Sequence, residues 1–335
     1  MNNTQCGFSG QWAGPGITVP IDFAPARGKS GAEVTVTSCD GHAFVVRRSG
    51  QGMPVFLLHD MAETQGAWDA VRGTLSWSNT VCTWDARGHG ASRGTPECAV
   101  PTLDLLASDL DAAITACAPK DAVLVGHGLG ALTVLEYLRN YGDQRVSGAV
   151  LVDQSPRMLT VPDWSLGLFG GFRAGDEMGF ESRIRADFAG AWSALQARAA
   201  AAAVHGDGGA HSQHGESHGL GGLAAGSMLA LWRSMIGRDY RADLAALRLP
   251  LLVVLGGGSL YDTEQLGRWF HAAVPFAKVV RYLKADHAPH VAAPARFARD
   301  VAAFAVPREA AMPTPSAAMA GAVGYAYVAA IHAAA

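Results

Sequence analysis

The strongest constraint on the fold is an alternation of short apolar runs with longer segments of helical spacing. Short runs rich in Val and Leu are typical of buried strands, and apolar residues three or four apart are typical of helices. The predicted strands are 33–37, 43–48, 54–58, 80–84, 122–125, 146–152, 251–255 and 277–283, and the predicted helices are 66–75, 102–117, 129–141, 192–204, 264–273 and 294–304. This order predicts an α/β protein with a mostly parallel, eight-stranded sheet and helices on both faces.

The alternation is interrupted once, which suggests how the chain is divided. Between residues 154 and 248, Trp, Phe, Met and Gly are mixed with helical pieces, and the segment has the size of an inserted helical cap. A Gly/His-rich stretch within it, 205–222, is predicted to be a loop. We therefore expect a core made of 33–153 and 249–306, with an N-terminal extension at 1–32 and an Ala/Pro-rich tail at 307–335.

Composition excludes several classes of partner. Twenty-six Lys and Arg against 29 Asp and Glu give a net charge of −3, so there is no broad basic surface for nucleic acid. The five cysteines are widely spaced and form no C-x-x-C pair, and the first thirty residues lack an apolar run of signal-peptide type. A cytoplasmic location is the expectation. Residues 316–335 are uncharged but dominated by Ala and Gly, so a membrane anchor is not expected.

The clearest motif is a glycine-rich turn between a predicted strand and a predicted helix. Val125-Gly126-His127-Gly128-Leu129-Gly130 places small residues where the chain must reverse sharply and where the helix must approach the strand closely. This is the shape of a nucleophile elbow. His59 follows the third strand, Asp85 to Ser92 follow the fourth, and His287 with His290 follows the last.

These motifs, in this order at the ends of successive strands, resemble the α/β-hydrolase superfamily over residues 34–304. The resemblance implies an enzyme of hydrolase type, esterase-like, with an inserted cap and no cofactor. In that superfamily the elbow reads Gly-x-Ser-x-Gly, whereas here the nucleophile position is Gly128, which carries no hydroxyl. Ordinary acyl-enzyme chemistry is therefore impossible, although glycine is compatible with the turn.

The resemblance also implies a general base and an acid to orient it. His287 holds the position of the base, with His290 as the fallback. The usual position of the acid, after the seventh strand, is Ser259, which has no carboxylate. Asp153, at the carboxyl end of the sixth strand, is the preferred candidate, and Asp262 is the alternative acid.

The loop after the third predicted strand also departs from the usual pattern of the superfamily, as the elbow and the acid position do. Where the superfamily usually has His-Gly, this chain has His59-Asp60. By resemblance, the backbone N–H groups of Met61 and Leu129 would form the oxyanion hole. An ionised Asp60 aimed into that hole would be repulsive, so we expect its side chain to point outward and cap the helix that begins near Gly66.

The remaining polar and aromatic residues of interest are expected to have structural or pocket-lining roles rather than catalytic ones. Asp85, Arg87, His89 and Ser92 are expected to brace their loop. The histidines 205, 211, 214 and 218 lie in the Gly-rich stretch, which does not favour a fixed helix, so no metal site is predicted. Aromatic and Met side chains of the inserted segment suggest an apolar substrate pocket between cap and sheet; they are Trp164, Phe169, Phe172, Trp232 and Met235.

Three hypotheses of function remain open. The first is a hydrolase for a small apolar ester or related acyl compound, with His287 and Asp153 activating water directly; general-base catalysis alone contributes about 10²- to 10⁴-fold. The second is a lyase, isomerase, cyclase or cofactor-free oxygenase in which His287 removes a substrate proton. The third is a non-catalytic binding protein. The first is our leading hypothesis, and the oligomeric state is open.

Overall fold

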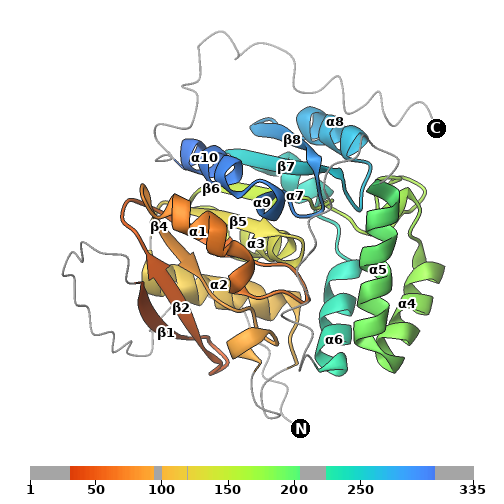
Figure 1. The fold of residues 1–335 in the computed structure, drawn as a ribbon, viewed down its shortest axis with the longest axis horizontal. Helices are drawn as coiled ribbons and strands as arrows, with labels where there is room; N and C mark the ends of the chain where they lie inside the picture. The colour runs from red at the N-terminus through yellow and green to blue at the C-terminus, as the bar shows by residue number, and fades with distance from the viewer. Residues whose placement is uncertain (1–30, 94–99, 119, 204–223, 306–335) are drawn as a thin grey trace. The chain divides into compact units, whose positions relative to one another are not determined.

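A computed structural model of the 335-residue chain describes residues 31–93, 100–118, 120–203 and 224–305. The eight strands are β1 (Ala32–Thr37), β2 (Ala43–Ser49), β3 (Met53–Leu58), β4 (Asn79–Thr83), β5 (Ala122–His127), β6 (Val146–Val152), β7 (Leu251–Gly258) and β8 (Ala277–Asp286). They form one sheet in the order β1-β2-β4-β3-β5-β6-β7-β8 (Figure 1). The pairs β1–β2 and β2–β4 are antiparallel and all others are parallel, which confirms the predicted α/β-hydrolase type of fold.

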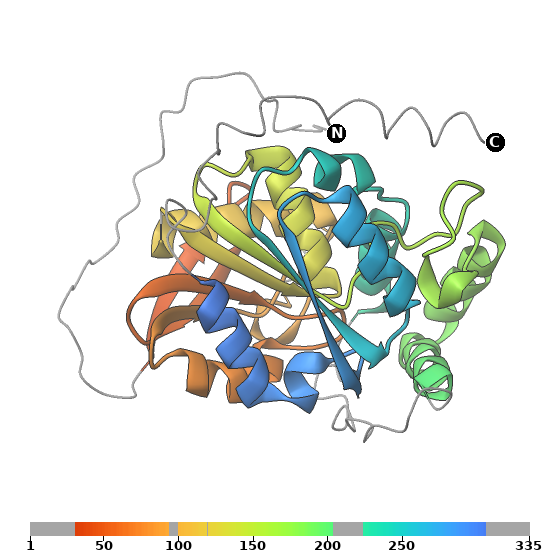
Figure 2. The ribbon, with the colours of Figure 1, turned by 90° about the horizontal axis from the view of Figure 1, so that it is seen from above.

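Helices cover both faces of the sheet. The principal ones are α1 (Asp69–Leu75), α2 (Leu103–Cys117), α3 (Leu129–Tyr141), α8 (Thr263–Ala273) and α10 (Pro294–Phe304). Figure 2 shows α1 and α10 together on one face, with α2, α3 and α8 on the other. Each face is sealed by its own apolar cluster, and the cluster on the side of α1 and α10 includes the fully buried Trp68, Val125 and Phe297. The central strands are therefore apolar on both faces, as buried parallel strands must be.

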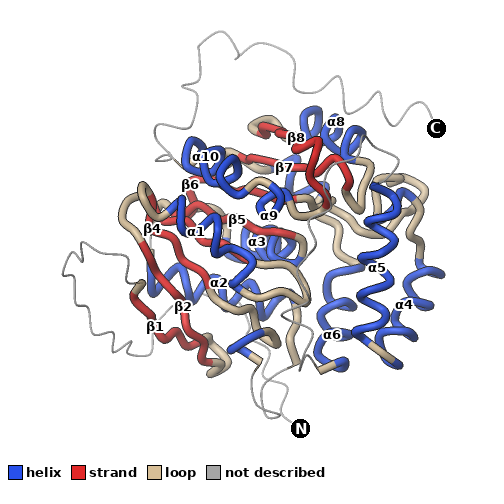
Figure 3. The backbone as a smooth tube through the Cα atoms, in the orientation of Figure 1, coloured by secondary structure: helices blue, strands red, loops and turns tan. Residues whose placement is uncertain are grey.

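In the described part of the chain between β6 and β7, the structure has four α-helices and one short 3-10 helix. They are η3 (Leu168–Gly170), α4 (Ala174–Ala186), α5 (Phe188–Ala203), α6 (Ala225–Ile236) and α7 (Arg241–Ala246). In Figure 3, α4, α5 and α6 stand as a group beside the sheet. Trp232 packs edge-on against Phe180 and Phe172, so these large side chains form the core of the inserted segment. The expected Gly/His loop lies outside the described residues.

Four of the observed strands, β2, β5, β7 and β8, extend beyond their predicted carboxyl ends. β8 runs to Asp286 rather than to residue 283, because Gly258 of β7 pairs with Asp286 across a register irregularity. β5 likewise includes His127, which is paired with Val152. Polar residues at these ends stay in the sheet because neighbouring strands form hydrogen bonds with their backbone groups. This pairing involves residues far apart in the sequence, so the local pattern of apolar residues does not predict it.

The order of the strands places the site. The chain passes from β3 to β4 on one side and then returns to β5 on the other, so β3 and β5 flank the point where the strand order reverses. In such sheets, ligands bind beyond the carboxyl ends of the strands at this point. Parallel pairing of β3 with β5 and of β5 with β6 brings the residues that follow Leu58, His127 and Val152 to one edge.

The close approach of α3 to β3 depends on glycine. A Cβ atom at Gly130 would lie 2.3 Å from the backbone oxygen of Leu58, and one at Gly126 would lie 2.3 Å from the backbone of Gly130. No side-chain rotation can relieve a clash between a Cβ atom and backbone. These two glycines therefore set the distance between the elbow and the loop after β3.

We predict that Gly130→Ala lowers the free energy of unfolding by about 1–3 kcal/mol, or prevents folding, because the new methyl group overlaps the backbone of β3. Gly179→Ala is the matched control, since Gly179 lies in α4 with open space around it and should gain about 0.5–1 kcal/mol. Urea denaturation followed by circular dichroism measures both. Equal effects of the two substitutions would refute the close-approach argument.

Candidate active site

The elbow has the strained turn that its sequence indicates. Gly128 lies between β5 and α3 with φ +50° and ψ −112°, a conformation in which glycine carries no Cβ penalty. Its N–H donates to the carbonyl of Val152, which ties the turn to the end of β6. The nucleophile position is therefore held at the carboxyl edge of the sheet, although it carries no side chain.

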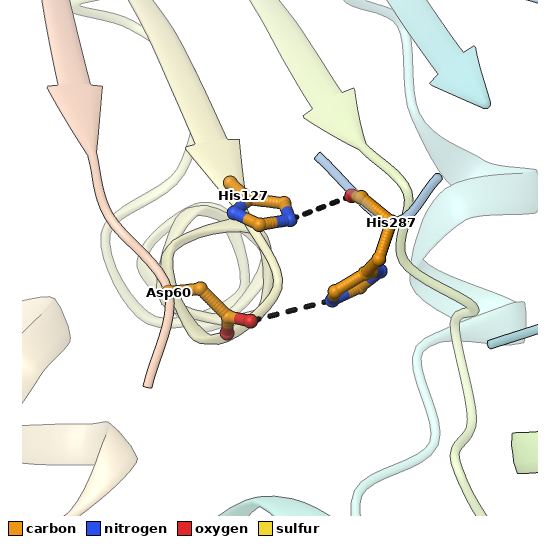
Figure 4. A group of neighbouring side chains, drawn as sticks. All are labelled: Asp60, His127 and His287. Atoms are coloured by element: carbon orange, nitrogen blue, oxygen red, sulfur yellow. Dashed lines mark hydrogen bonds and ion pairs between the residues drawn. The ribbon is translucent and has the colours of Figure 1, made fainter. Parts of the chain in front are cut away.

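The carboxylate of Asp60 fills the space above Gly128. A Cβ atom built on Gly128 would lie 1.9 Å from Asp60 Oδ1 and 2.6 Å from Oδ2. Figure 4 shows the Asp60 side chain pointing toward His287. The prediction that Asp60 points outward as a helix cap is wrong: the residue is 8% exposed, and Thr64 caps the turn at Gln65–Trp68 instead. Removal of the elbow side chain opens the space that this carboxylate occupies.

Asp60 contacts both of the groups that a nucleophile at the elbow would need. Its Oδ1 accepts the backbone N–H of Leu129 at 2.6 Å, and its Oδ2 lies 3.3 Å from His287 Nε2. The N–H of Leu129, predicted to be half of an open oxyanion hole, is therefore bonded to Asp60. The other predicted donor, the N–H of Met61, has no protein acceptor within the described part of the chain.

The backbone of Asp60 is fixed by its neighbours. Its N–H donates to Glu63 Oε2 at 3.1 Å, and its carbonyl accepts from His59 Nδ1 at 2.7 Å. His59 Nε2 in turn accepts the N–H of Ala86 at 2.9 Å, so this imidazole is a neutral link between two loops. Both main-chain groups of Asp60 are thus satisfied, and the residue is presented with little freedom.

A second buried histidine supports the same loop. His89 Nε2 accepts the N–H of Ala62, whose φ of +65° is rare for a residue with a Cβ atom. Burial lowers the pKa of His89 to about 3, so this ring stays neutral and keeps an acceptor nitrogen at ordinary pH. The bracing role expected of His89 is therefore realised on the loop that carries Asp60.

His287 and Asp153 meet as the resemblance implied. His287 Nδ1 lies 2.7 Å from Asp153 Oδ2, and the fully buried carboxylate also accepts from Gly256 N at 2.8 Å and from Ser259 Oγ at 2.5 Å. Ser259, at the usual acid position, thus orients the carboxylate that replaces it. The catalytic roles of His287 and Asp153 stay predictions; their juxtaposition is a feature of the structure.

The alternative candidates lie elsewhere. Asp262 is the N-cap of α8 and accepts the backbone N–H of Gln265 at 3.0 Å, so it is a helix cap rather than a partner of His287. His290 is fully buried, with its ring centroid 4.1 Å from that of Trp68 and 4.7 Å from that of His127. The structure therefore leaves Asp153 and His287 as the pair.

The charges in this cluster alternate. Burial opposes a charge on His287, but hydrogen bonds to Asp153 and Asp60 outweigh it and raise the pKa of His287 to about 10. Burial also opposes ionisation of Asp60, yet the hydrogen bond from His287 and the nearby histidine charges lower its pKa. The resting site is an imidazolium between two carboxylates.

The raised pKa of His287 also makes folding stability depend on pH. The stability that His287 contributes is complete below its unfolded pKa of ~6.5 and is lost as pH rises through about 10.

A second charge pair lies behind the first. His127 Nε2 is 2.8 Å from the carbonyl of His287, and its Nδ1 is 3.6 Å from Glu63 Oε2. Burial is the largest single influence and lowers the pKa of His127, but Glu63 and Asp60 together raise it, so its net shift is upward. Sequence reasoning did not single out His127 or Glu63. The sequence does contain a feature that could have indicated this pair: a histidine within the elbow motif, and a carboxylate three residues after Asp60 in the adjacent loop.

Among residues 31–93, 100–118, 120–203 and 224–305, two groups of three side chains have potential ligand atoms within 4.8 Å of one another: Asp60, His127 and His287, and Glu63, His127 and His290. Each group contains a carboxylate that is already within 3.6 Å of a histidine nitrogen. Charge pairing therefore accounts for both arrangements, and we assign no metal to them. The histidines 205, 211, 214 and 218 lie outside the described residues.

Asp85 and Arg87 hold their loop through separate partners. Arg87 does not pair with Asp85; it lies 2.5 Å from Asp40 and 2.7 Å from Asp109. Asp85 accepts the backbone N–H groups of Gln65 and Ala91, each at 2.8 Å. These contacts tie the loop after β4 to the β1–β2 turn and to α2, which next-neighbour charges in sequence do not reveal.

The expected pocket between cap and sheet stays a prediction, and a cavity found among the described residues lies elsewhere. This small cavity beside the elbow is lined by residues of β3, α2 and α3 and of the loops after β3 and β4, including Leu58, His59, Trp84, Leu129 and Thr133. Trp164 instead packs edge-on against Trp269, and Trp232 packs within the insertion.

Within the described residues, no helix is both long and apolar enough to cross a membrane.

Comparison with known proteins identifies the family of the chain. The sequence pattern of the alpha/beta hydrolase family matches residues 55–300, and the chain belongs to that family. A pimeloyl-[acyl-carrier protein] methyl ester esterase of Chromobacterium violaceum is 27% identical over 270 residues, which cover 77% of this chain and 96% of the relative. A non-heme chloroperoxidase of Kitasatospora aureofaciens is 30% identical over 128 residues, 38% of this chain and 46% of the relative.

Three haloperoxidase-type relatives are matched over only 40%, 46% and 52% of their own lengths. Among solved structures, an esterase from Exiguobacterium antarcticum has a TM-score of 0.68, with 16% identity, 82% of this chain covered and 99% of that chain. At that identity the likeness shows the fold alone.

We predict that Asp60→Asn lowers the pKa of His287 from about 10 toward the ordinary value of ~6.5, because the imidazolium loses one of its two carboxylate neighbours. Two-dimensional ¹H–¹⁵N NMR of the imidazole nitrogens over pH 5–11 measures the change. Asp262→Asn is the control and should leave the titration unchanged. An unaltered titration in Asp60→Asn would contradict the site as described.

Proposed function

We propose that this chain is a hydrolase for a small apolar substrate, with the Asp60 carboxylate in the place of the absent elbow Ser. The observation that carries the proposal is the position of Asp60, which fills the space above Gly128 and contacts both Leu129 N–H and His287. Ester and related acyl compounds are the first substrates to test, because the family and the methyl ester esterase relatives support ester hydrolysis.

The charge of the site favours this assignment over direct activation of water by a His287–Asp153 dyad. An imidazolium whose pKa is near 10 has no free nitrogen lone pair at neutral pH, so it cannot accept a proton from water. The ionised Asp60 carboxylate is the group beside it that can act on a substrate. In this proposal Asp153 holds the ring of His287, and His287 holds and later exchanges protons with the reacting oxygen atoms.

We expect Asp60→Asn and His287→Gln each to lower kcat/KM by at least ~10³-fold toward any substrate that the wild type hydrolyses, with Glu264→Gln on exposed α8 as a neutral control. The panel consists of p-nitrophenyl esters of increasing acyl length, methyl esters, primary alkyl bromides and terminal epoxides, followed by release of acid or chromophore. Turnover that survives Asp60→Asn would refute the proposal. Silence of the wild type on the whole panel, with measurable binding, would favour a binding protein.

Gly128 and Asp60 are expected to depend on each other. Gly128→Ser alone should lower the free energy of unfolding by about 1–3 kcal/mol, because the new Cβ atom overlaps the Asp60 carboxylate. Combining it with Asp60→Gly removes the clash, frees Leu129 N–H and restores a Ser elbow beside His287. The double variant should hydrolyse p-nitrophenyl esters faster than either single variant. Additive effects on stability, measured by urea denaturation, would contradict this coupling.

A further inference from the structure

We propose that Glu63 and His127 form a positioning pair, which holds together the loops that carry Asp60 and His287 and does so while the His127 ring is an imidazolium. The inference deepens the proposed function and rests on it, because it concerns the contact between Asp60 and His287. It is carried by two main-chain contacts of the pair, one on each loop. Glu63 and His127 act through other residues, so neither is a catalytic residue.

Glu63 joins the loop after β3 to the end of β5. Its Oε2 atom accepts the backbone N–H of Asp60 at 3.1 Å and lies 3.6 Å from His127 Nδ1. One oxygen atom therefore contacts both the main chain of Asp60 and the ring of the histidine in the elbow. The side chain of His127 is only 1% exposed, so the ring has little access to water that could take the place of Glu63.

His127 carries the link on to the loop after β8. Its Nε2 atom lies 2.8 Å from the main-chain carbonyl oxygen of His287 (Figure 4). Because β6 and β7 lie between β5 and β8 in the sheet, ladder hydrogen bonds do not pair β5 with β8 directly. The side chain of His127 makes this connection instead. Through Glu63 and His127, the backbone of Asp60 is connected to the backbone of His287.

The partners of His127 determine the charge that its ring must carry. A carboxylate and a carbonyl oxygen are both acceptors, and a neutral imidazole has only one N–H, so it can donate to only one of them. An imidazolium has two N–H groups and can donate to both. The 3.6 Å separation from Glu63 is an ion-pair distance rather than a hydrogen bond, and it too favours the charged ring. The upward shift in the pKa of His127 agrees with this geometry.

The groups that face His127 come from two loops. Glu63 and Asp60 favour the imidazolium, whereas burial and the charge of His287 oppose it. The ring centroid of His287 is 4.6 Å from that of His127, and the ring centroid of His290 is 4.7 Å from it. Two cationic rings so close repel each other. The benefit of His127 to His287 therefore lies in the contact with its main chain and not in the charge of the ring.

The protonation of His127 in the wild-type protein tests the first part of the proposal. At pH ~6.5 an ordinary histidine is half protonated. Two-dimensional ¹H–¹⁵N NMR at this pH should show both ring nitrogens of His127 almost fully protonated, and the spectrum of His127→Phe, which lacks these signals, assigns them. A ring that is half protonated or less would overturn the proposal, because one of its two acceptors would then lack a donor.

His127→Phe tests the positioning itself. Phe keeps an aromatic ring beside His287 and His290 but has no donor for the His287 carbonyl. If His127 acted only through its charge, removal of this cation would raise the pKa of His287 above about 10. If His127 holds His287 beside Asp60, loss of that contact lowers the pKa of His287 toward ~6.5. We expect the decrease, measured by ¹H–¹⁵N NMR over pH 5–11; a rise or no change would overturn the positioning role.

Glu63→Gln tests the pair from its other end. The amide keeps an oxygen for the N–H of Asp60 but carries no negative charge, so the titration midpoints of His127 and His287 should both fall. Gln and Glu have nearly the same shape, so this variant also decides the matter if His127→Phe does not fold. Glu264→Gln, the same change on exposed α8, is the matched control and should move neither midpoint. A lower midpoint for His127 with an unchanged one for His287 would overturn the coupling between the loops.

The proposed function and this inference fail in different ways. On an ester that the wild type hydrolyses, Glu63→Gln should lower kcat by ~10²-fold with KM little changed, because misplaced reactive groups slow the chemical step. Turnover that is indifferent to Asp60→Asn refutes the proposed function. A His287 midpoint that is indifferent to both Glu63→Gln and His127→Phe, with turnover that still depends on Asp60, refutes the positioning pair alone.

Discussion

The contact between the Asp60 carboxylate and the backbone of the elbow is the interaction on which the rest of the site depends. It satisfies the N–H at the start of α3, fills the space above Gly128, and places a negative charge beside His287. An ionised group in so buried a position is costly unless it is paired and hydrogen-bonded. Here the pairing is provided, and the fold supplies it from the carboxyl ends of three strands, β3, β5 and β8, with β6 and β7 lying between the last two.

The fold could be predicted from the sequence because its information is local and repeated. The apolar runs of β3, β5, β6 and β7 and the helical spacing of α2 and α3 each point to the same architecture, so errors of a few residues at strand ends do not change it. The ends themselves depend on pairing with other strands. That is why β8 extends to Asp286 and β5 to His127.

The site was predictable in part. The meeting of Asp153 with His287 follows from strand order and motif positions, which place both at one edge. The direction of the Asp60 side chain does not follow, because electrostatics considered residue by residue makes an inward carboxylate repulsive. The deciding facts are spatial: a glycine where a side chain is usual, a carboxylate where a glycine is usual, and two histidines close enough to balance the charge. Gly128 and Asp60 are informative only as a pair. The side chain that is missing at the elbow is matched by an additional side chain in the loop after β3, and the second fills the space left by the first.

The fixed backbone of Asp60 has an evolutionary consequence. Because Glu63 and His59 hold both of its main-chain groups, the backbone of Asp60 is restrained, and a side chain at the elbow would fit only if the carboxylate rotated away from Leu129 and His287. On the proposed function, a return to a hydroxyl nucleophile would require changes in two separate loops, and either change alone would leave the site incomplete. Such sign epistasis acts as a ratchet, which would keep descendants of this sequence on the carboxylate side of the family.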